Sequence, residues 1–397
     1  MGANLISMSF KAPSRQRGFT LVELFVGMTI ALIAILVMTQ VLVSFDSQKR
    51  FSSGGADAQN SGMIAMHTIE ADIRQGGYGM ATMDSLYCTF NTSLPFNGRP
   101  FVPVMIIPAN LARTDAANVL GIPPGDADTD VIAVMYSQNP TAVEGVPLVS
   151  PAAAGATAYN FGKNVTGFAA NDFVLSAQAG LPCTVAQATS VNAFARQITV
   201  NRGAGAAYTA NTGSMFNLGP NGMVMRVYAV RGGSLTVCDF WTSNCAADIS
   251  GMNAAAISAL WVPIASNIVG LRAQYGWDTS GVADMNVDAY CRSRLTPASA
   301  NCPAPDTGAT VPNTSCDWTR IGTLRVALVA RSPERGTPGV NVSDATIRLW
   351  PDSAVAGTPT TVGPIFAVAN RADRHKVFET TVPIRNIIWH GAQASCT

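Results

Sequence analysis

Charged residues and histidine are scarce in this sequence. Charged residues make up 12% of its 397 residues, the formal net charge is +1, and there are three histidines. So balanced a charge argues against nucleic acid as a partner, because proteins that bind it usually carry a basic field. The sequence also has no C-x-x-C pair and no G-x-S-x-G motif. We therefore expect neither a zinc site nor an enzyme.

Apolar residues, glycine, proline and cysteine are plentiful instead. Hydrophobic residues make up 48% of the chain, and mean hydropathy is +0.22, which excludes a disordered chain. The 35 glycines and 23 prolines predict a loop-rich body that contains β-strands, and the eight cysteines indicate an oxidising compartment.

One long apolar run lies near the N-terminus. Residues 22–43 would span ~33 Å as a helix, enough to cross a bilayer. The preceding residues carry Lys11, Arg15 and Arg17 and no acid, so this end should stay in the cytoplasm. We expect a single pass through the inner membrane, with everything beyond residue 45 in the periplasm. Glu23, inside the run, needs a partner of opposite charge.

The residues around Glu23 resemble a known signal. Arg17-Gly18-Phe19-Thr20-Leu21-Val22-Glu23-Leu24 is similar to the N-terminal signal of type IV prepilins. The resemblance implies that a prepilin peptidase cuts between Gly18 and Phe19 and methylates the new amine of Phe19. It also implies that Glu23 neutralises the amine of a neighbouring subunit in a filament. The leader would be residues 1–18, or shorter if translation starts at Met8.

A helix should continue beyond the membrane. Residues 19–45 form the predicted transmembrane and filament-core helix, and residues 46–77 an amphipathic continuation. We expect a bend or an interruption at residues 52–55, Ser-Ser-Gly-Gly, and a buried stripe of Met63, Met66, Ile69 and Ile73. Residues 78–397 then form a periplasmic globular domain, with a hairpin turn at Gly232-Gly233. Strands are predicted at residues 102–107, 130–137, 172–177, 193–200, 223–231, 234–240, 268–277, 323–332 and 377–385.

Several of these segments also resemble PilW-type minor pilins. They are residues 72–79, the strand pair around Tyr228 and Leu235, residues 267–278, and residues 378–386. The resemblance implies an α+β, pilin-like fold with a long N-terminal helix packed on an antiparallel β-rich domain. It implies a minor pilin that helps to prime pilus assembly at or near the pilus tip, on the cell surface. Its partners would be other minor pilins, the major pilin and a tip adhesin.

Two alternatives remain open from the sequence. A J-type minor pseudopilin of a type II secretion system has the same signal and general architecture. A periplasmic binding or adhesion protein could also use an uncut helix as its anchor.

Cysteines and acidic loops are the other candidate site residues. We expect disulfides Cys238–Cys245 and Cys291–Cys302, while Cys88 and Cys183 have no evident partner. No cofactor is expected, although the loop with Asp278, Asp284 and Asp288 is a weak candidate for Ca²⁺. A second acidic run, Asp126, Asp128 and Asp130, is interpreted as a solvated loop that enters a strand. A basic cluster, Arg371, Arg374, His375 and Lys376, is interpreted as a charged surface.

Overall fold

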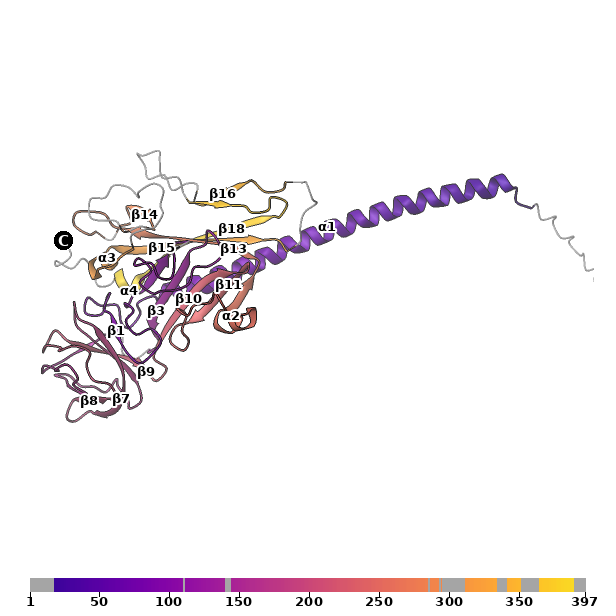
Figure 1. Cartoon of the computed structure of the whole chain (residues 1–397). Coiled ribbons are helices and arrows are strands. Elements are labelled where there is room, and N and C mark those ends of the chain that lie inside the picture. The colour runs from indigo at the N-terminus through magenta and orange to yellow at the C-terminus, as the bar shows by residue number, and fades with distance from the viewer. Residues whose placement is uncertain are drawn as a thin grey trace, which may run out of the picture. The chain divides into compact units, whose positions relative to one another are not determined.

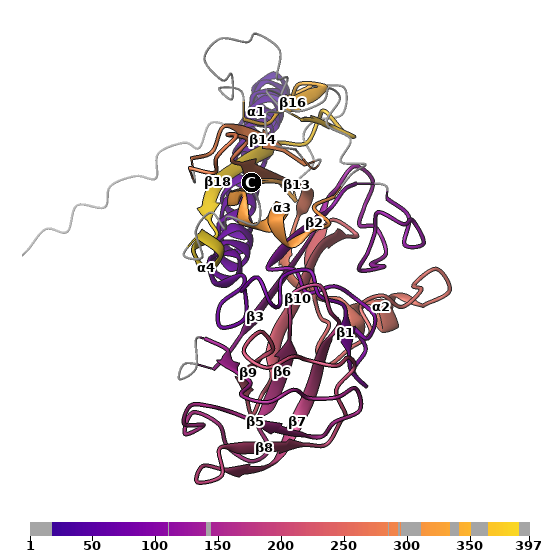
Figure 2. The same ribbon diagram turned by 90° about the vertical axis from the view of Figure 1, so that its left-hand side faces the viewer.

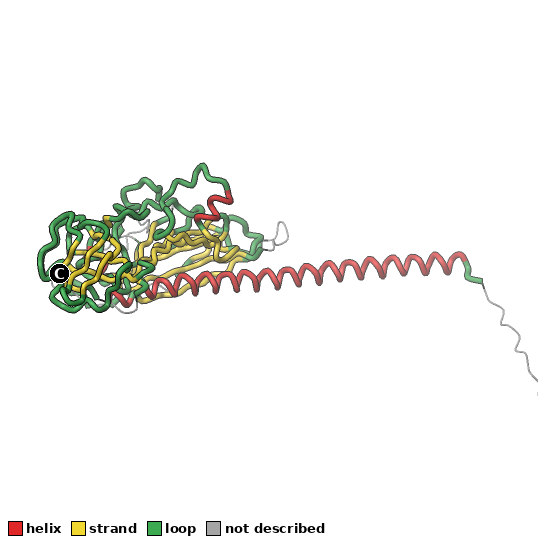
Figure 3. Tube along the Cα trace, turned by 90° about the horizontal axis from the view of Figure 1, so that it is seen from below, coloured by secondary structure: helices red, strands yellow, loops and turns green. Residues whose placement is uncertain are grey.

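The computed structural model describes residues 18–109, 111–139, 144–284, 286–292, 294, 311–333, 341–350 and 364–388. Helix α1 (Leu21–Gln75) is followed by a large body of antiparallel strands and loops (Figure 1). Figure 3 shows how little helix the strand-rich body contains. The predicted α+β class is therefore confirmed. The chain divides into two compact units between Ser53 and Gly54.

Helix α1 is continuous from Leu21 to Gln75, so the interruption predicted at residues 52–55 is absent. Glycine in a helix costs about 1 kcal/mol relative to alanine. That cost weakens a helix but does not end it where both flanks are helical. The helix ends instead at Gln75, where Gly77 adopts a left-handed conformation with φ of 80°.

Two antiparallel sheets form the main body. Sheet A has the strand order β12 (Val262–Ser266), β11 (Ser234–Asp239), β10 (Met223–Arg231), β3 (Val131–Ser137) and β2 (Val104–Ile107). Sheet B has the order β14 (Ala289–Cys291), β13 (Ile268–Trp277), β15 (Ile321–Arg331) and β18 (His375–Pro383). The Gly232-Gly233 hairpin between β10 and β11 is confirmed, with Arg231 opposite Ser234 and both glycines at positive φ.

Shorter elements surround these sheets. Strands β16 (Thr346–Arg348) and β17 (Ile365–Ala367) form a separate hairpin, and the remaining helices are α2 (Ala254–Leu260), α3 (Ser315–Thr319) and α4 (Arg385–Ile388).

A further sheet is inserted between β3 and β10 and has its own core. This inserted sheet has the order β4 (Val146–Pro147), β9 (Ser214–Gly219), β6 (Phe173–Ala177), β7 (Cys183–Asn192), β8 (Gln197–Val200) and β5 (Ala158–Asn160), with β1 (Phe90–Asn91) parallel to β7. Figure 2 shows its strands β5–β9 gathered at the opposite end of the domain from β14 and β18. Of these strands the sequence predicted β6 and β8, the latter beginning four residues early, and it did not predict β1, β4, β5, β7 or β9. The two long missed strands, β7 and β9, mix polar residues with small or apolar ones, which hides their periodicity.

The last third of α1 packs on both sheets. Ala58, Ala65, Met66, Ile69 and Ile73 are buried, whereas Met63 is 48% exposed. The predicted stripe is therefore wrong at Met63. Small residues such as Ala58 and Ala65, and not Met63, lie on the packed face of the helix. Their small side chains let the helix lie close to the strands.

Asp72 anchors this part of the helix to sheet A. Its carboxylate accepts hydrogen bonds from the hydroxyls of Tyr136 on β3, at 3.0 Å, and of Tyr228 on β10. Arg226 Nη1 lies 3.0 and 3.1 Å from the two carboxylate oxygens. Burial, and then the charge of Asp72, raise the pKa of both tyrosines, so their hydroxyls stay protonated and donate.

A second buried carboxylate joins the two sheets. Asp130 is fully buried, and its Oδ1 lies 2.9 Å from Arg292 Nη1 and 3.3 Å from Arg272 Nη1. The backbone N–H of Ala273 on β13 donates to its other oxygen at 3.0 Å. The interpretation of residues 126–130 as a solvated loop is therefore wrong for Asp130. Asp126 is also engaged, because it accepts from the N–H groups of Gly232 and Gly233.

The end of α1 is capped by a residue far away in the sequence. Asn386 Nδ2 in α4 donates to the carbonyls of Arg74, Gln75 and Gly76, at 3.4, 3.2 and 3.1 Å. The last carbonyls of a helix have no partner within it. Asn386 therefore satisfies part of this end and holds α4 against it.

Asp72→Asn tests the first anchor. The amide removes the charge that Arg226 and the two tyrosines share, so we expect the free energy of unfolding to fall by about 2–3 kcal/mol. Thermal unfolding of the full chain in detergent micelles, followed by near-ultraviolet circular dichroism, measures this. Asp57→Asn, at an exposed position of the same helix, is the control and should change stability by less than about 0.5 kcal/mol. Equal losses for the two variants would contradict the assignment.

Two glycines of α1 should respond oppositely to alanine. A Cβ at Gly62 would overlap the Phe378 ring of β18, whereas a Cβ at Gly55 meets no atom within 4 Å. We expect Gly62→Ala to lower the free energy of unfolding by about 1–3 kcal/mol. Gly55→Ala should raise it by about 0.5–1 kcal/mol through helix propensity. The same unfolding experiment decides, and a gain in stability for Gly62→Ala would refute close packing at this position.

Candidate functional site

The segment that carries the predicted cleavage site lies just outside the helix. Gly18, Phe19 and Thr20 precede the first helical residue, Leu21, and all three are exposed. Phe19 is 85% exposed, and no atom lies within 4 Å of a Cβ built at Gly18. Gly18 and Phe19 are therefore exposed outside the helix in the described part of the chain.

Thr20 and Glu23 form a capping box at the start of α1. The N–H of Glu23 donates to Thr20 Oγ1 at 3.2 Å, and the N–H of Thr20 donates back to Glu23 Oε2 at 3.4 Å. These bonds satisfy two donors that the helix itself leaves free, and the carboxylate lies at the positive end of the helix dipole. The Thr-x-x-Glu spacing carries this signal in the sequence. Within a single chain, Glu23 thus already has a local partner.

The first part of α1 can cross a membrane by length and composition. Residues Leu21–Asp46 have a mean hydropathy of 2.6, and none is buried by the rest of the chain. This is the one such helix in the described part of the chain. Thr29 and Thr39 donate their hydroxyls to the carbonyls of Phe25 and Ile35, both at 3.0 Å. Their polar groups are therefore satisfied within the helix, as hydrocarbon requires.

The structure confirms one predicted disulfide and contains another that the sequence did not predict. Cys238 is bonded to Cys245, the pairing that their spacing predicts, with 5.9 Å between the Cα atoms. Cys88 is bonded to Cys183, which joins β7 to the segment before β1. Their separation of 95 residues explains why the sequence could not pair them. Cys291 is also disulfide-bonded, but Cys302 lies outside the described residues.

The candidate Ca²⁺ loop uses its carboxylates to hold itself together. Asp278 accepts from the N–H groups of Ser280 and Asp284, at 3.0 and 2.8 Å. Asp288 accepts from the N–H of Thr279 at 2.8 Å. Across the described ranges, no group of three or more His, Cys, Asp or Glu residues is arranged to hold a metal ion. The three aspartates therefore act as acceptors for turns of the loop.

Two residues of the basic cluster, Arg371 and His375, contact a neighbouring segment of the domain. His375 Nδ1 lies 3.2 Å from Ser343 Oγ, and Arg371 Nε donates to the Ser343 carbonyl at 3.2 Å. Burial lowers the pKa of His375, which favours the neutral ring. These contacts support the interpretation as local structure at a charged surface.

The N-terminal sequence motif indicates the class of protein. Residues 13–39 match the family model of the prokaryotic N-terminal methylation motif, which covers Gly18, Phe19, Glu23 and most of the apolar helix. Together with the one apolar helix found in the described residues, this motif fits a membrane-anchored, prepilin-like protein.

A second match covers part of the globular domain. Residues 244–386 match the model of the type IV pilus-assembly protein W, PilW. The two matches confirm the resemblance to PilW-type minor pilins and support a type IV pilus-related minor pilin. Comparison with curated proteins and with solved structures gives no match. The PilW segment contains all of sheet B and Asn386, the residue that caps α1.

The two disulfides should differ in their effect on stability. In the chain-entropy model the stabilisation grows with the length of the closed loop, here 95 against 7 residues. We expect the Cys88→Ser/Cys183→Ser variant to lose about 2 kcal/mol more than Cys238→Ser/Cys245→Ser. Denaturant unfolding of both variants in detergent measures the difference. A larger loss for the short-loop variant would contradict the expectation.

Proposed function

We propose that this chain is a minor pilin that helps to prime type IV pilus assembly and takes a position at or near the pilus tip. A prepilin peptidase would remove residues 1–18 and methylate Phe19. Residues 19–45 would then be first the membrane anchor and later part of the filament core, with residues 46–77 as the continuation of the helix. Residues 78–397 would lie in the periplasm and, after assembly, on the cell surface. The observation that carries the proposal is an exposed apolar helix directly behind a methylation motif, on a chain with a PilW segment.

Glu23 would change partners during assembly. Cleavage after Gly18 leaves Thr20 and Glu23 in place, so the capping box survives and stabilises the helix start in the membrane. In a filament, the free amine of Phe19 on a neighbouring subunit is a stronger partner than a backbone N–H, because both groups are charged. In an apolar filament core, where water cannot screen the charges, the pair favours a specific register between subunits.

The size of the domain supports a position at the tip. Every subunit in a filament shaft must fit against identical neighbours, so bulk outside the common pilin body obstructs the repeat. The inserted sheet is such bulk, and it lies outside the segment that matches PilW. A subunit at the end of the filament has no copy above it and tolerates the extra mass.

The partners follow from this role. They would be other minor pilins in a priming complex, the major pilin that polymerises from it, and a tip adhesin. The PilW match favours a pilus over a type II secretion system. We propose no catalytic role, no cofactor and no nucleic-acid partner.

Deletion of the gene tests the priming role. We expect surface pili to disappear while the pool of major pilin in the inner membrane is unchanged, and the chain supplied in trans should restore the pili. Shear preparations and membrane fractions, both probed for the major pilin, measure the two quantities. Normal piliation in the deletion strain would refute the proposal.

Glu23→Ala tests the assembly contact. We expect the variant to insert into the inner membrane at the normal level but to be recovered at least tenfold less in sheared filaments, since the subunit amine loses its counter-charge. Thr20→Val is the matched control, because it removes the hydroxyl half of the capping box and keeps the carboxylate. It should assemble more efficiently than Glu23→Ala. Equal recovery of Glu23→Ala and the unmodified chain would contradict the role of the charge.

A further inference from the structure

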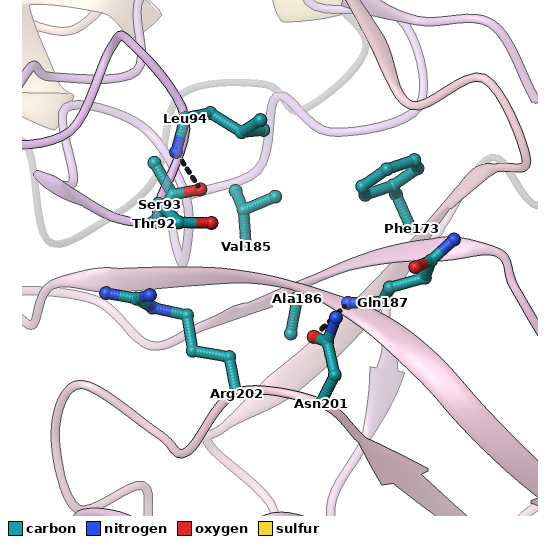
Figure 4. A pocket seen from close by; sticks show the side chains of 9 residues that line it. All are labelled: Thr92, Ser93, Leu94, Phe173, Val185, Ala186, Gln187, Asn201 and Arg202. Atoms are coloured by element: carbon teal, nitrogen blue, oxygen red, sulfur yellow. Dashed lines mark hydrogen bonds between the residues drawn. The ribbon is translucent and has the colours of Figure 1, made fainter.

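The inserted sheet forms a pocket that no part of pilus assembly requires. It is lined by the loop after β1, by β6 and β7, and by the residues after β8, and its volume is about 150 Å³ (Figure 4). These segments lie outside both matched regions of the chain. The pocket therefore belongs to the part of this chain that the family signatures do not account for.

The pocket is polar, with one aromatic wall. Thr92 and Ser93 line one side, Gln187 and Asn201 another, and the Phe173 ring lies beside Gln187 (Figure 4). Hydroxyls and amides can both donate and accept hydrogen bonds. The ring supplies an apolar face for C–H groups.

Arg202 brings an uncompensated positive charge to this pocket. Its Nε and Nη2 donate to Asn91 Oδ1 at 3.1 and 2.8 Å, and Asn91 is a neutral partner. No carboxylate of the described residues forms an ion pair with Arg202, although eight other ion pairs are present there. The guanidinium group therefore keeps N–H groups beyond those bound to Asn91, and these can bind an anion such as a carboxylate.

The walls are held in place before any ligand arrives. The Cys88–Cys183 disulfide ties the segment before β1 to the start of β7, and Asn201 accepts the N–H of Gln187 at 2.9 Å. Phe173 packs edge-on against Trp241, with 5.0 Å between ring centroids. A site fixed in this way loses little conformational entropy on binding.

We propose that this pocket binds an acidic sugar unit, of the kind that a surface polysaccharide or glycan carries. Arg202 binds the carboxylate, Gln187, Asn201, Thr92 and Ser93 bind the hydroxyls, and Phe173 contacts the apolar face of the ring. A closed cavity of about 150 Å³ holds benzene. This pocket has a similar volume and includes the exposed Ser93 in its lining, so part of a larger sugar ring projects from it. The proposal does not depend on the role in pilus priming.

Ligand-observed NMR tests the proposal on the full chain in a detergent that contains no sugar. The probe is glucuronate, and glucose is the neutral control with the same ring. We expect saturable binding of glucuronate, binding of glucose at least tenfold weaker, and no displacement of glucuronate by an equal concentration of inorganic phosphate. Equal binding of both sugars would overturn the role of the charge. Full displacement by phosphate would reduce the site to a general anion site and overturn the assignment of a sugar.

Variants identify the pocket as the site of binding. Arg202→Gln removes the charge and keeps an amide that can reach Asn91, so it should weaken glucuronate binding at least tenfold. Ser93→Tyr at the exposed rim should block the pocket without touching Arg202, and it should abolish binding. Arg196→Gln is the matched control, because Arg196 is an exposed arginine of the same sheet that bonds the Gly162 carbonyl. Binding that survives Ser93→Tyr, or that Arg196→Gln weakens as much as Arg202→Gln, would overturn the proposal.

Discussion

The body of this protein is organised around the burial of one charge, that of Asp72 on α1. An acidic residue in the last turn of a helix lies at the negative end of the helix dipole, where it is unfavourable. Burial makes it more so, because a charge without partners in a protein interior is very costly. Arg226 and the hydroxyls of Tyr136 and Tyr228 offset both effects at once. The cluster is satisfied in one geometry, and that geometry fixes the end of the helix over β3 and β10.

Contacts of buried or capped polar groups also connect the other parts of the main body. Asp130 draws Arg272 and Arg292 of the sheet B region to the start of β3, and Asn386 closes the end of α1. Each of these contacts connects segments far apart in the sequence, and each pairs a buried or capped polar group with side-chain donors from another segment. The PilW segment supplies the donors on the sheet B side and the cap. The family match therefore covers one side of these contacts, while the partners of Asp72 on β3 and β10 lie outside it.

The two ends of α1 obey different physical rules. The first part is apolar on all sides and satisfies its hydroxyls internally, which suits lipid or the interior of a filament. The last part has one face of small and apolar residues that packs against strands. Glu23 is the exception in the first part, and its capping box shows how a carboxylate can be held near the helix start before a charged partner is present.

The sequence by itself determined the apolar helix, the cleavage and methylation motif, the Gly232-Gly233 hairpin and the long strands β10, β13, β15 and β18. These features depend on local composition and spacing, so they can be read without knowing the fold. The sequence also paired Cys238 with Cys245, which are close along the chain. Only the tertiary structure decided that Cys88 meets Cys183, that Asp130 is buried, and that Met63 is exposed where Gly62 packs. It also assembled the pocket around Arg202 from four separate segments. The reason is the same in each case: these contacts join distant residues, and no local periodicity records which distant residues will meet.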